Sequence, residues 1–429
     1  MIRLLIVYFL LVTIYLISNN VDYLVYHTVF FSILSFSILQ LTNKYNKLVF
    51  FNPLIIFNVA YYIVFSITDI LNDLYNPNLT FLIVLGFFAI NLGYFLIINL
   101  NTKLSLAKNK PIYQGIIYSQ FTQISLFIGI LSAIYYFYKF GTPLLSENIT
   151  KNRTLSLTVE ISPIFQLIKY NANVVLMLFI MSVSYNKTYN IKKKTKYLTV
   201  ILAVVYLFML ILETNRTSFY YLLFPCFFFF FFINIDIFNF KKIKYIVYFV
   251  VLASSVSALR YGKIENIGLS VYKEFLALKY NLTHVFNYWS VNDDLRYGEM
   301  HFRGMKVILP GRQEDTSLYL KNFLEIKFGG GGMTPTLIGQ IYIDFGALGI
   351  FLEMFLFGIL LAPIFSFVLK SKDIYYIILY AYLLAYIPYI MRNGLFYSYV
   401  NVIVVIMIFL HTRRYTINRN ELNENITNK

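Results

Sequence analysis

The segment PTLIGQIYIDFGALGIFLEMFLFGILLAPIFSFVL, residues 335–369, is a run of mainly apolar residues that is too long for one plain membrane crossing. A helix needs about 20 apolar residues to cross the hydrocarbon core of a bilayer. The first part of this segment, residues 335–349, mixes polar residues and glycines with apolar ones. This pattern predicts an outer half-helix or a re-entrant piece that leads into a membrane-spanning helix.

The rest of the chain is also strongly apolar, with 59% hydrophobic residues and a mean hydropathy of +0.66. The apolar runs are continuous rather than alternating, which favours membrane helices over a β-barrel. We therefore expect an all-α, polytopic integral membrane protein with about 12 transmembrane helices. The expected spans lie near residues 2–18, 23–42, 49–68, 79–99, 117–138, 163–185, 197–212, 217–234, 244–259, 335–369, 374–391 and 395–411.

One polar insert, residues 260–334, interrupts the apolar runs. It carries ten of the 36 Lys and Arg residues, eight of the 20 Asp and Glu residues, and the single tryptophan. The chain is thus expected to divide into nine N-terminal membrane helices (1–259), this large loop, three C-terminal membrane helices (335–411) and a tail (412–429). A task in the aqueous phase is expected to fall to the loop.

The formal net charge of +16 is open to two interpretations, nucleic-acid binding or membrane topology. Most of the surplus lies in short loops between the expected spans, which favours topology. Twenty Lys and Arg residues lie on the side of the termini, whereas six lie on the opposite side outside the insert. Because short cytoplasmic loops are enriched in positive charge, the termini are expected to be cytoplasmic and the insert to face outward. No nucleic-acid partner is expected.

A short polar segment, Glu213-Thr-Asn-Arg-Thr-Ser, separates the seventh and eighth expected spans. An arginine at the centre of a bilayer costs about 2.5–3.5 kcal/mol, so a membrane arginine is usually paired or functional. The alternative is a plain hairpin turn in which the Arg216 side chain extends to the water interface. A turn needs neither Glu213 nor Arg216, and we expect both residues to be catalytic.

Several cations on the expected outward side suit the binding of a pyrophosphate group. Guanidinium groups form bidentate contacts with phosphate oxygens. Arg303 and Lys306 are three residues apart and are expected to share a helix face. The alternative is a solvated loop helix near lipid headgroups. The expected diphosphate- or glycan-binding residues are Arg153, Arg260, Arg303, Lys306 and Arg312.

His301 lies in the same loop, two residues before Arg303. An unperturbed imidazole has a pKa of about 6.5, which suits a general base, although a lone histidine is more often a packed or surface residue. We expect His301 to be catalytic. Glu353, inside the tenth span, is expected to pair with Arg153 or Arg392.

Several common catalytic motifs are absent from the sequence. It has no Asp-x-Asp motif, no phosphate-binding Gly-Lys-Ser/Thr loop, no Gly-x-Ser-x-Gly elbow and no His-Glu-x-x-His. Four scattered histidines and the single cysteine, Cys226, do not make a conventional metal site. We expect neither a metal nor another cofactor, so the energy for a reaction must come with the substrate or from a gradient.

Three stretches of the chain resemble motifs of the Wzy-type oligosaccharide repeat unit polymerases of bacteria. Residues 213–217 (ETNRT) are similar to the short arginine-centred motif of that family. Residues 297–304 (YGEMHFRG) through 309–312 (LPGR) resemble its loop segment, and residues 333–349 (MTPTLIGQIYIDFGALG) match its Pro, Gly, Tyr and Phe-Gly pattern. Some members carry an arginine followed eleven residues later by glycine in two outward loops, a pattern that this sequence lacks.

The resemblance implies a glycosyltransferase that polymerises undecaprenyl-diphosphate-linked oligosaccharide repeat units. The site would face outward from the bacterial cytoplasmic (inner) membrane, and the product would be the O-antigen of lipopolysaccharide or a capsule. A chain-length regulator protein is a further expected partner. The alternatives are a flippase or other transporter of lipid-linked oligosaccharides, and a transferase like the O-antigen ligases. A transporter usually shows two related halves, which we do not find in this sequence.

Overall fold

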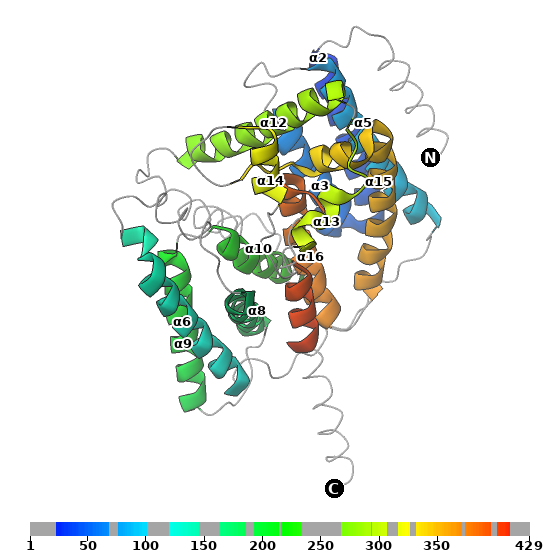
Figure 1. Cartoon of the computed structure of the whole chain (residues 1–429). Helices are drawn as coiled ribbons and strands as arrows, with labels where there is room; N and C mark the ends of the chain where they lie inside the picture. Colours follow the sequence, from blue (N-terminus) through cyan, green and yellow to red (C-terminus); the bar gives the residue numbers. More distant parts are fainter. Residues whose placement is uncertain are drawn as a thin grey trace.

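In the computed structural model, every regular element of the described residues is a helix (Figure 1). The described residues are 23–67, 76–100, 120–145, 163–185, 193–213, 216–233, 267–292, 294–306, 316–326, 332–370, 374–395 and 401–411. The expected spans at 2–18 and 244–259 lie outside them.

The helices of the apolar regions begin and end within a few residues of the expected spans. They are α2 (Tyr23–Tyr45), α3 (Pro53–Tyr62), α5 (Pro77–Leu100), α6 (Gln120–Phe140), α8 (Pro163–Tyr185), α9 (Lys193–Leu212), α10 (Arg216–Ile233), α15 (Leu337–Lys370), α16 (Ile374–Asn393) and a last helix at Asn401–His411. Short helical turns occur at η1 (Asn46–Phe51), η2 (Ile63–Ile67) and η3 (Pro143–Leu145).

Three helices in the described part of the chain are long and apolar enough to cross a membrane. They are Pro77–Ile98, Gln120–Phe140 and Leu337–Lys370, and five shorter apolar helices accompany them. The fold is therefore all-helical with membrane-spanning character, as expected. The larger figure of about 12 crossings stays a prediction.

Helices α5 and α15 pack closely against each other, and two glycines allow their backbones to touch. A Cβ atom at Gly93 would lie 2.1 Å from the carbonyl oxygen of Phe355, and one at Gly358 would lie 2.1 Å from that of Ile90. Any larger side chain would push the helices apart. Small residues at a crossing are the usual means by which membrane helices pack closely.

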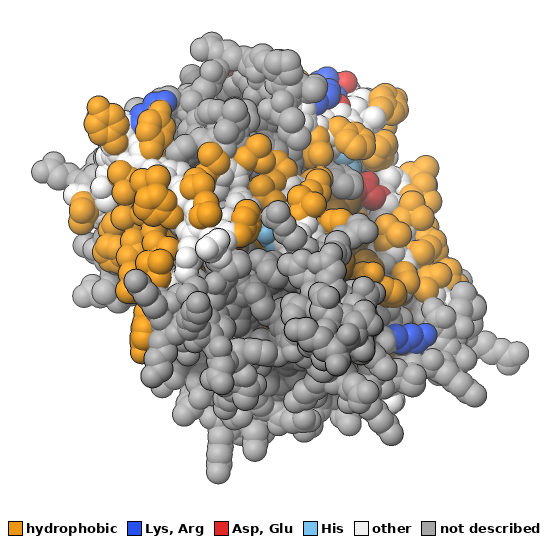
Figure 2. Space-filling model, turned by 90° about the horizontal axis from the view of Figure 1, so that it is seen from below, with side chains coloured by type: hydrophobic (Ala, Val, Ile, Leu, Met, Phe, Trp, Pro, Cys, Tyr) orange, Lys and Arg blue, Asp and Glu red, His pale blue; other side chains and the backbone are white. Residues whose placement is uncertain are grey.

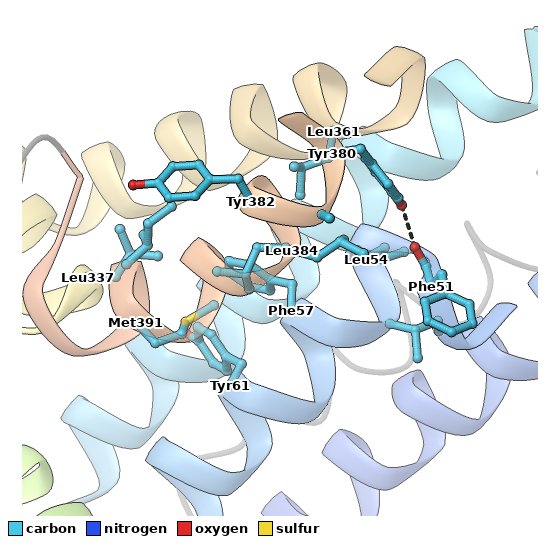
Figure 3. Close-up of a cluster of buried hydrophobic side chains, with 14 of the residues drawn as sticks. Phe51, Leu54, Phe57, Tyr61, Leu337, Leu361, Tyr380, Tyr382, Leu384 and Met391 are labelled. Carbon is cyan, nitrogen blue, oxygen red and sulfur yellow. Dashed lines mark hydrogen bonds between the residues drawn. The ribbon is translucent and has the colours of Figure 1, made fainter. Parts of the chain in front are cut away.

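Aromatic and aliphatic side chains fill the core around α3 and α16 (Figure 3). Phe51, Leu54 and Phe57 pack there with Leu384 and Tyr380. The Tyr380 hydroxyl donates a hydrogen bond to the main-chain carbonyl of Phe51, so η1 is tied to α16 by a polar contact inside the apolar core.

The surface of the bundle is rich in exposed apolar side chains, which cover much of the described area in Figure 2. On α15 they recur every four residues, at Leu348, Leu352, Leu356 and Leu360, each at least 49% exposed. This spacing puts them on one helix face. A continuous exposed apolar stripe is unfavourable in water and is typical of a surface in contact with lipid.

The polar insert is folded into helices of its own: α12 (Ile267–Asn292), α13 (Glu299–Lys306) and α14 (Thr316–Phe323). A small second core joins them to α15 through Trp289, Met300, Leu320 and Ile343. The indole Nε1 of Trp289 donates to the carbonyl oxygen of Asp294 at 2.8 Å. The insert is thus a packed layer of helices against the start of α15.

Candidate functional site: a buried imidazole between two carboxylates

A kink at Gly346 divides α15 into a first segment, residues 337–345, and a second segment, residues 347–370. Gly346 has φ 66° and ψ −160°, a conformation that favours glycine because it has no Cβ atom. The break frees backbone carbonyls at the end of the first segment. Those of Ile343 and Asp344 accept hydrogen bonds from the main-chain N–H groups of Arg296 and Tyr297, each at 3.0 Å. The kink therefore docks the insert onto α15.

The side chain of Asp344 holds the start of α13. Its Oδ1 accepts a hydrogen bond from the main-chain N–H of Met300, and its Oδ2 accepts one from that of His301, both at 3.0 Å. The first N–H groups of a helix lack partners within the helix and carry partial positive charge. A fully buried carboxylate is suited to satisfy them, and Asp344 has no exposed surface.

The imidazole of His301 bridges Asp344 and Glu353, which lie on opposite sides of the kink. Its Nδ1 lies 2.5 Å from Oδ2 of Asp344, and its Nε2 lies 2.7 Å from Oε1 of Glu353. The exposed fractions of the side chains are 0% for Asp344, 8% for His301 and 22% for Glu353. Glu353 is therefore the member of this triad that a substrate can reach.

Two opposing effects set the pKa of His301. Burial alone lowers it, because removal from water disfavours the charged ring. The hydrogen bonds to Asp344 and Glu353 and their negative charges outweigh burial and raise the pKa to about 9. At neutral pH the ring is thus protonated and donates to both carboxylates, which is consistent with its two short contacts.

Gln340 connects this triad to the end of α16. Its side-chain nitrogen donates to the carbonyl oxygen of Met300 at 3.0 Å and to that of Leu395 at 2.9 Å. Gln340 is fully buried. The residue before His301 is therefore held from α15 and joined to the segment that follows α16.

Two arginines of the insert lie over aromatic rings of α14. The guanidinium carbon of Arg303 is 3.5 Å from the centre of the Tyr319 ring, and that of Arg296 is 5.1 Å from the centre of the Phe323 ring. The two rings are stacked. Arg303 also pairs with Glu299, one helical turn away.

Arg296 forms an ion pair of 2.7 Å with Asp294. Lys306, at the end of α13, is exposed. Arg303 is thus an ordered cation held from two sides, and Arg296 is a second one that the sequence analysis missed.

Glu213 is almost completely buried at the end of α9 and forms an ion pair with Lys169 of α8. Lys169 also lies 5.4 Å from the centre of the Tyr136 ring. Arg216 is the first residue of α10. Glu213 therefore joins the end of α9 to α8, and α10 begins three residues later; this junction holds an ion pair that a simple hairpin turn does not need.

This junction and the triad lie toward the same end of the bundle. α10 and α16 pack antiparallel, because Tyr221 contacts Tyr389 whereas Phe232 contacts Tyr380. The start of α10 therefore lies near the end of α16. Leu395, just beyond that end, accepts the hydrogen bond from Gln340. The start of α10, at Arg216, and His301 therefore belong to one end of the described bundle.

The remaining candidates have different outcomes. Arg153, Arg260 and Arg312 lie outside the described residues. The partner that the structure shows for Glu353 is His301, and the expected pairing with Arg153 falls outside the described residues. A signal for the two carboxylates, though not for their pairing with His301, was present in the sequence, since Asp344 and Glu353 are the only charged residues between 335 and 369. Charged groups within a membrane segment usually mark a functional site.

The contacts of His301 differ from those of a metal-binding histidine. Both ring nitrogens of His301 are occupied by carboxylates, and the described residues hold no group of three or more His, Cys, Asp or Glu side chains placed to bind a metal ion. The triad is a hydrogen-bonded unit of one imidazole and two carboxylates.

The protein is a multi-pass helical membrane protein, because it has membrane-spanning helices and an exposed apolar surface. It also has a buried triad of one imidazole and two carboxylates, which is suited to proton transfer. The sequence matches the family model described as "Putative O-antigen polymerase" over residues 48–408, and the chain belongs to that family. Membership implies a glycosyltransferase-type polymerase of polysaccharide biosynthesis. Comparison with curated proteins and with solved structures finds no match.

Proposed function

We propose that this protein joins undecaprenyl-diphosphate-linked oligosaccharide repeat units into a surface polysaccharide on the outer face of the bacterial cytoplasmic membrane. The observation that carries the proposal is the position of His301 between Asp344 and Glu353. It gives a member of the O-antigen polymerase family an ordered acid–base unit at the junction of the insert and a membrane helix.

The reaction requires a base and a site for a diphosphate. A hydroxyl oxygen of the acceptor unit attacks the anomeric carbon of the donor glycan and forms the new glycosidic bond. The bond from that carbon to the diphosphate oxygen breaks, and its electron pair leaves with the diphosphate. The hydroxyl proton passes to a base. The donor is already activated by its diphosphate, so the atoms and charges balance without another reactant.

Glu353 is the best-placed proton acceptor. It is the most exposed member of the triad. It contacts the His301 ring, which is already protonated at neutral pH and therefore cannot take the hydroxyl proton itself. His301 would then orient the Glu353 carboxylate and balance its charge, with Asp344 as the buried anchor. The role first expected for His301, that of the base itself, passes in this proposal to its neighbour. Glu213 is less suited because it is 2% exposed and paired with Lys169.

The departing diphosphate needs fixed positive charge. Arg303 and Arg296 are ordered cations at the insert, and Lys306 is an exposed one. Arg216 lies at the same end of the bundle, where it would complete the charge around the leaving group. Arg153, Arg260 and Arg312 stay in the proposal as expected contacts of the diphosphate or the glycan.

The lipid part of the substrate also has a matching surface. The exposed stripe on α15 includes Leu352 and Leu356, which flank Glu353 in the sequence. A polyisoprenyl tail that lies along this stripe would keep the attached diphosphate close to the triad. The same helix thus offers an apolar face for the lipid and a carboxylate for the sugar hydroxyl.

The experiment that tests the proposal is a glycan gel from a deletion strain that expresses single variants. The strain without the gene should carry one repeat unit on its surface, and wild-type protein should restore a ladder of polymer. Glu353→Gln should fail to restore the ladder. Glu325→Gln, the same change at an exposed residue of the insert, is the matched control and should restore it.

The other candidate activities give different gels. Loss of even the single repeat unit from the deletion strain would indicate a flippase. Free polymer that no longer reaches its surface acceptor would indicate a ligase-like transferase. A ladder restored by Glu353→Gln would overturn the assignment of the base.

A further inference from the structure

Gln340 lies one helical turn before Asp344, so the two side chains emerge from the same face of α15. Both reach Met300. Asp344 accepts a hydrogen bond from the Met300 N–H, and Gln340 donates one to the Met300 carbonyl, each at 3.0 Å. The main chain of Met300 is therefore held on both of its polar groups by one helix face. The next residue is His301, whose ring position follows from this grip.

Gly394 makes the second contact of Gln340 possible. Gly394 has φ 92° and ends α16, where its N–H donates to the carbonyl oxygen of Ile390 at 2.8 Å. A Cβ atom at this position would lie 2.2 Å from the side-chain oxygen of Gln340. A glycine is needed here for the backbone conformation and for the close approach. The end of α16 is thus shaped to receive this one amide.

The bonding pattern requires an amide at position 340. The side-chain nitrogen of Gln340 supplies both of its donors, to Met300 and to Leu395, and both acceptors are main-chain carbonyl oxygens. A carboxylate of the same shape has no donor when ionised. It would also place a negative charge against two carbonyl oxygens and beside Asp344. A methionine would fill the volume but donate nothing.

We propose that Gln340 is a positioning residue that sets His301 between its two carboxylates and couples that position to the end of α16 through Gly394 and Leu395. Its effect on catalysis rests on the function proposed above. Its effect on His301 does not, because the position of the ring can be measured without any glycan.

The experiment measures how fast diethyl pyrocarbonate modifies His301 in the purified full-length protein, by mass spectrometry of the modified peptides. In the wild-type protein the ring is shielded and both nitrogens are engaged. Gln340→Met and Gly394→Ala should each raise the modification rate of His301 about tenfold, the effect expected from loss of one or two buried hydrogen bonds. Gln123→Met is the matched control.

Gln123 also donates a side-chain hydrogen bond between helices, to Thr199 at 3.0 Å, but far from the triad in the sequence. Its substitution should leave the rate at His301 unchanged. Equal rates at His301 in the wild type and in folded Gln340→Met and Gly394→Ala would overturn the proposal. A rise that Gln123→Met shares would overturn it as well, because the effect would then be general loosening.

Gln340→Glu decides the question if the methionine variant does not fold. A protonated carboxyl group has one O–H to donate, so acid should restore one of the two bonds. The ratio of its His301 modification rate to that of the wild type should fall toward one as the pH is lowered from about 8 to about 5. A residue that only fills space would give a ratio independent of pH.

The two proposals fail in different ways. If wild-type protein makes no polymer from lipid-linked repeat units, the proposed function is wrong while the modification result still holds. If polymer forms but the modification rate of His301 does not change on substitution of Gln340, the positioning role is wrong and the function stands.

Discussion

His301 binds Asp344 twice, through its main-chain N–H at 3.0 Å and through its ring Nδ1 at 2.5 Å. One carboxylate therefore fixes both the start of α13 and the orientation of the imidazole. The rest of the ring's environment follows from this double contact, since the opposite nitrogen then points to Glu353. Single substitutions can separate the structural part of this arrangement from its chemical part.

Asp344→Asn should destabilise the protein strongly. The buried carboxylate accepts three hydrogen bonds, and removal of its charge leaves a protonated imidazole without its closest counterion. The expected loss is about 3–5 kcal/mol, the range found when one partner of a buried ion pair is removed. Thermal unfolding in detergent measures it. Asp294→Asn, at a 47% exposed side chain, should change stability by less than about 1 kcal/mol.

Glu353→Gln should abolish turnover and leave the protein folded. Its side chain is 22% exposed, so the amide is tolerated, but it cannot accept a proton from a sugar hydroxyl. Removal of a general base lowers rates about 10²–10⁴-fold. Polymerisation of purified lipid-linked repeat unit in proteoliposomes gives the rate. Retention of more than about a tenth of wild-type activity would argue for another acceptor.

Stability should depend on pH through His301. Its pKa in the folded protein, about 9, is above the ordinary imidazole value of 6.5. The ring therefore adds stability that is complete below about pH 6.5 and is lost as the pH rises through 9. Between pH 7 and 10 the wild type should lose about 2–3 kcal/mol relative to His301→Gln. If the difference in free energy of unfolding between the two proteins did not change with pH across this range, the raised pKa would be contradicted.

Arg216→Ala should abolish polymer while membrane levels of the protein stay near those of the wild type. Arg216→Lys should rescue poorly, because an ammonium group cannot make the bidentate contact of a guanidinium with phosphate. Glycan gels and immunoblots of the same membranes provide the two measurements. Wild-type chain lengths from the alanine variant would show that Arg216 has no catalytic role and that the polar segment is only a hairpin turn.

Orientation in the membrane can be measured with cysteines in a Cys226→Ser background. Asn292→Cys, at the exposed end of α12, should react with an impermeant thiol reagent in intact spheroplasts. Thr195→Cys, in the first turn of α9, should not. The opposite pattern would place the triad in the cytoplasm and exclude a donor on the outer face.

Sequence periodicity located most helices well, because an apolar run between polar loops constrains a membrane helix strongly. The start of α10 at Arg216 and the break in the long tenth segment both agree with the pattern around them. The partners of His301 were harder to predict. Asp344 and Glu353 are 43 and 52 residues away along the chain, and a single sequence contains no signal that pairs them.

The ordered positions of the arginine side chains also could not be predicted from the sequence. Arg303 was expected to bind the diphosphate or the glycan, and the structure places its guanidinium on the Tyr319 ring and in an ion pair with Glu299. The position of α14 decides this, and α14 is placed by the small core around Trp289 and Leu320. Tertiary packing, which local pattern does not encode, thus separates a solvated cation from an ordered one.

Gly93 and Gly358 bring the backbones of α5 and α15 into direct contact, and Glu353 precedes Gly358 by about 7.5 Å along the helix axis. α15 therefore cannot slide against α5 without a clash, so the Glu353 carboxylate keeps one position relative to α5. Under the proposed function, a carboxylate fixed in this way would meet each new repeat unit in the same geometry, whether the attached polymer is short or long. The packing of α5 and α15 would then provide no measure of glycan length, and length would be set by release of the polymer or by a separate protein.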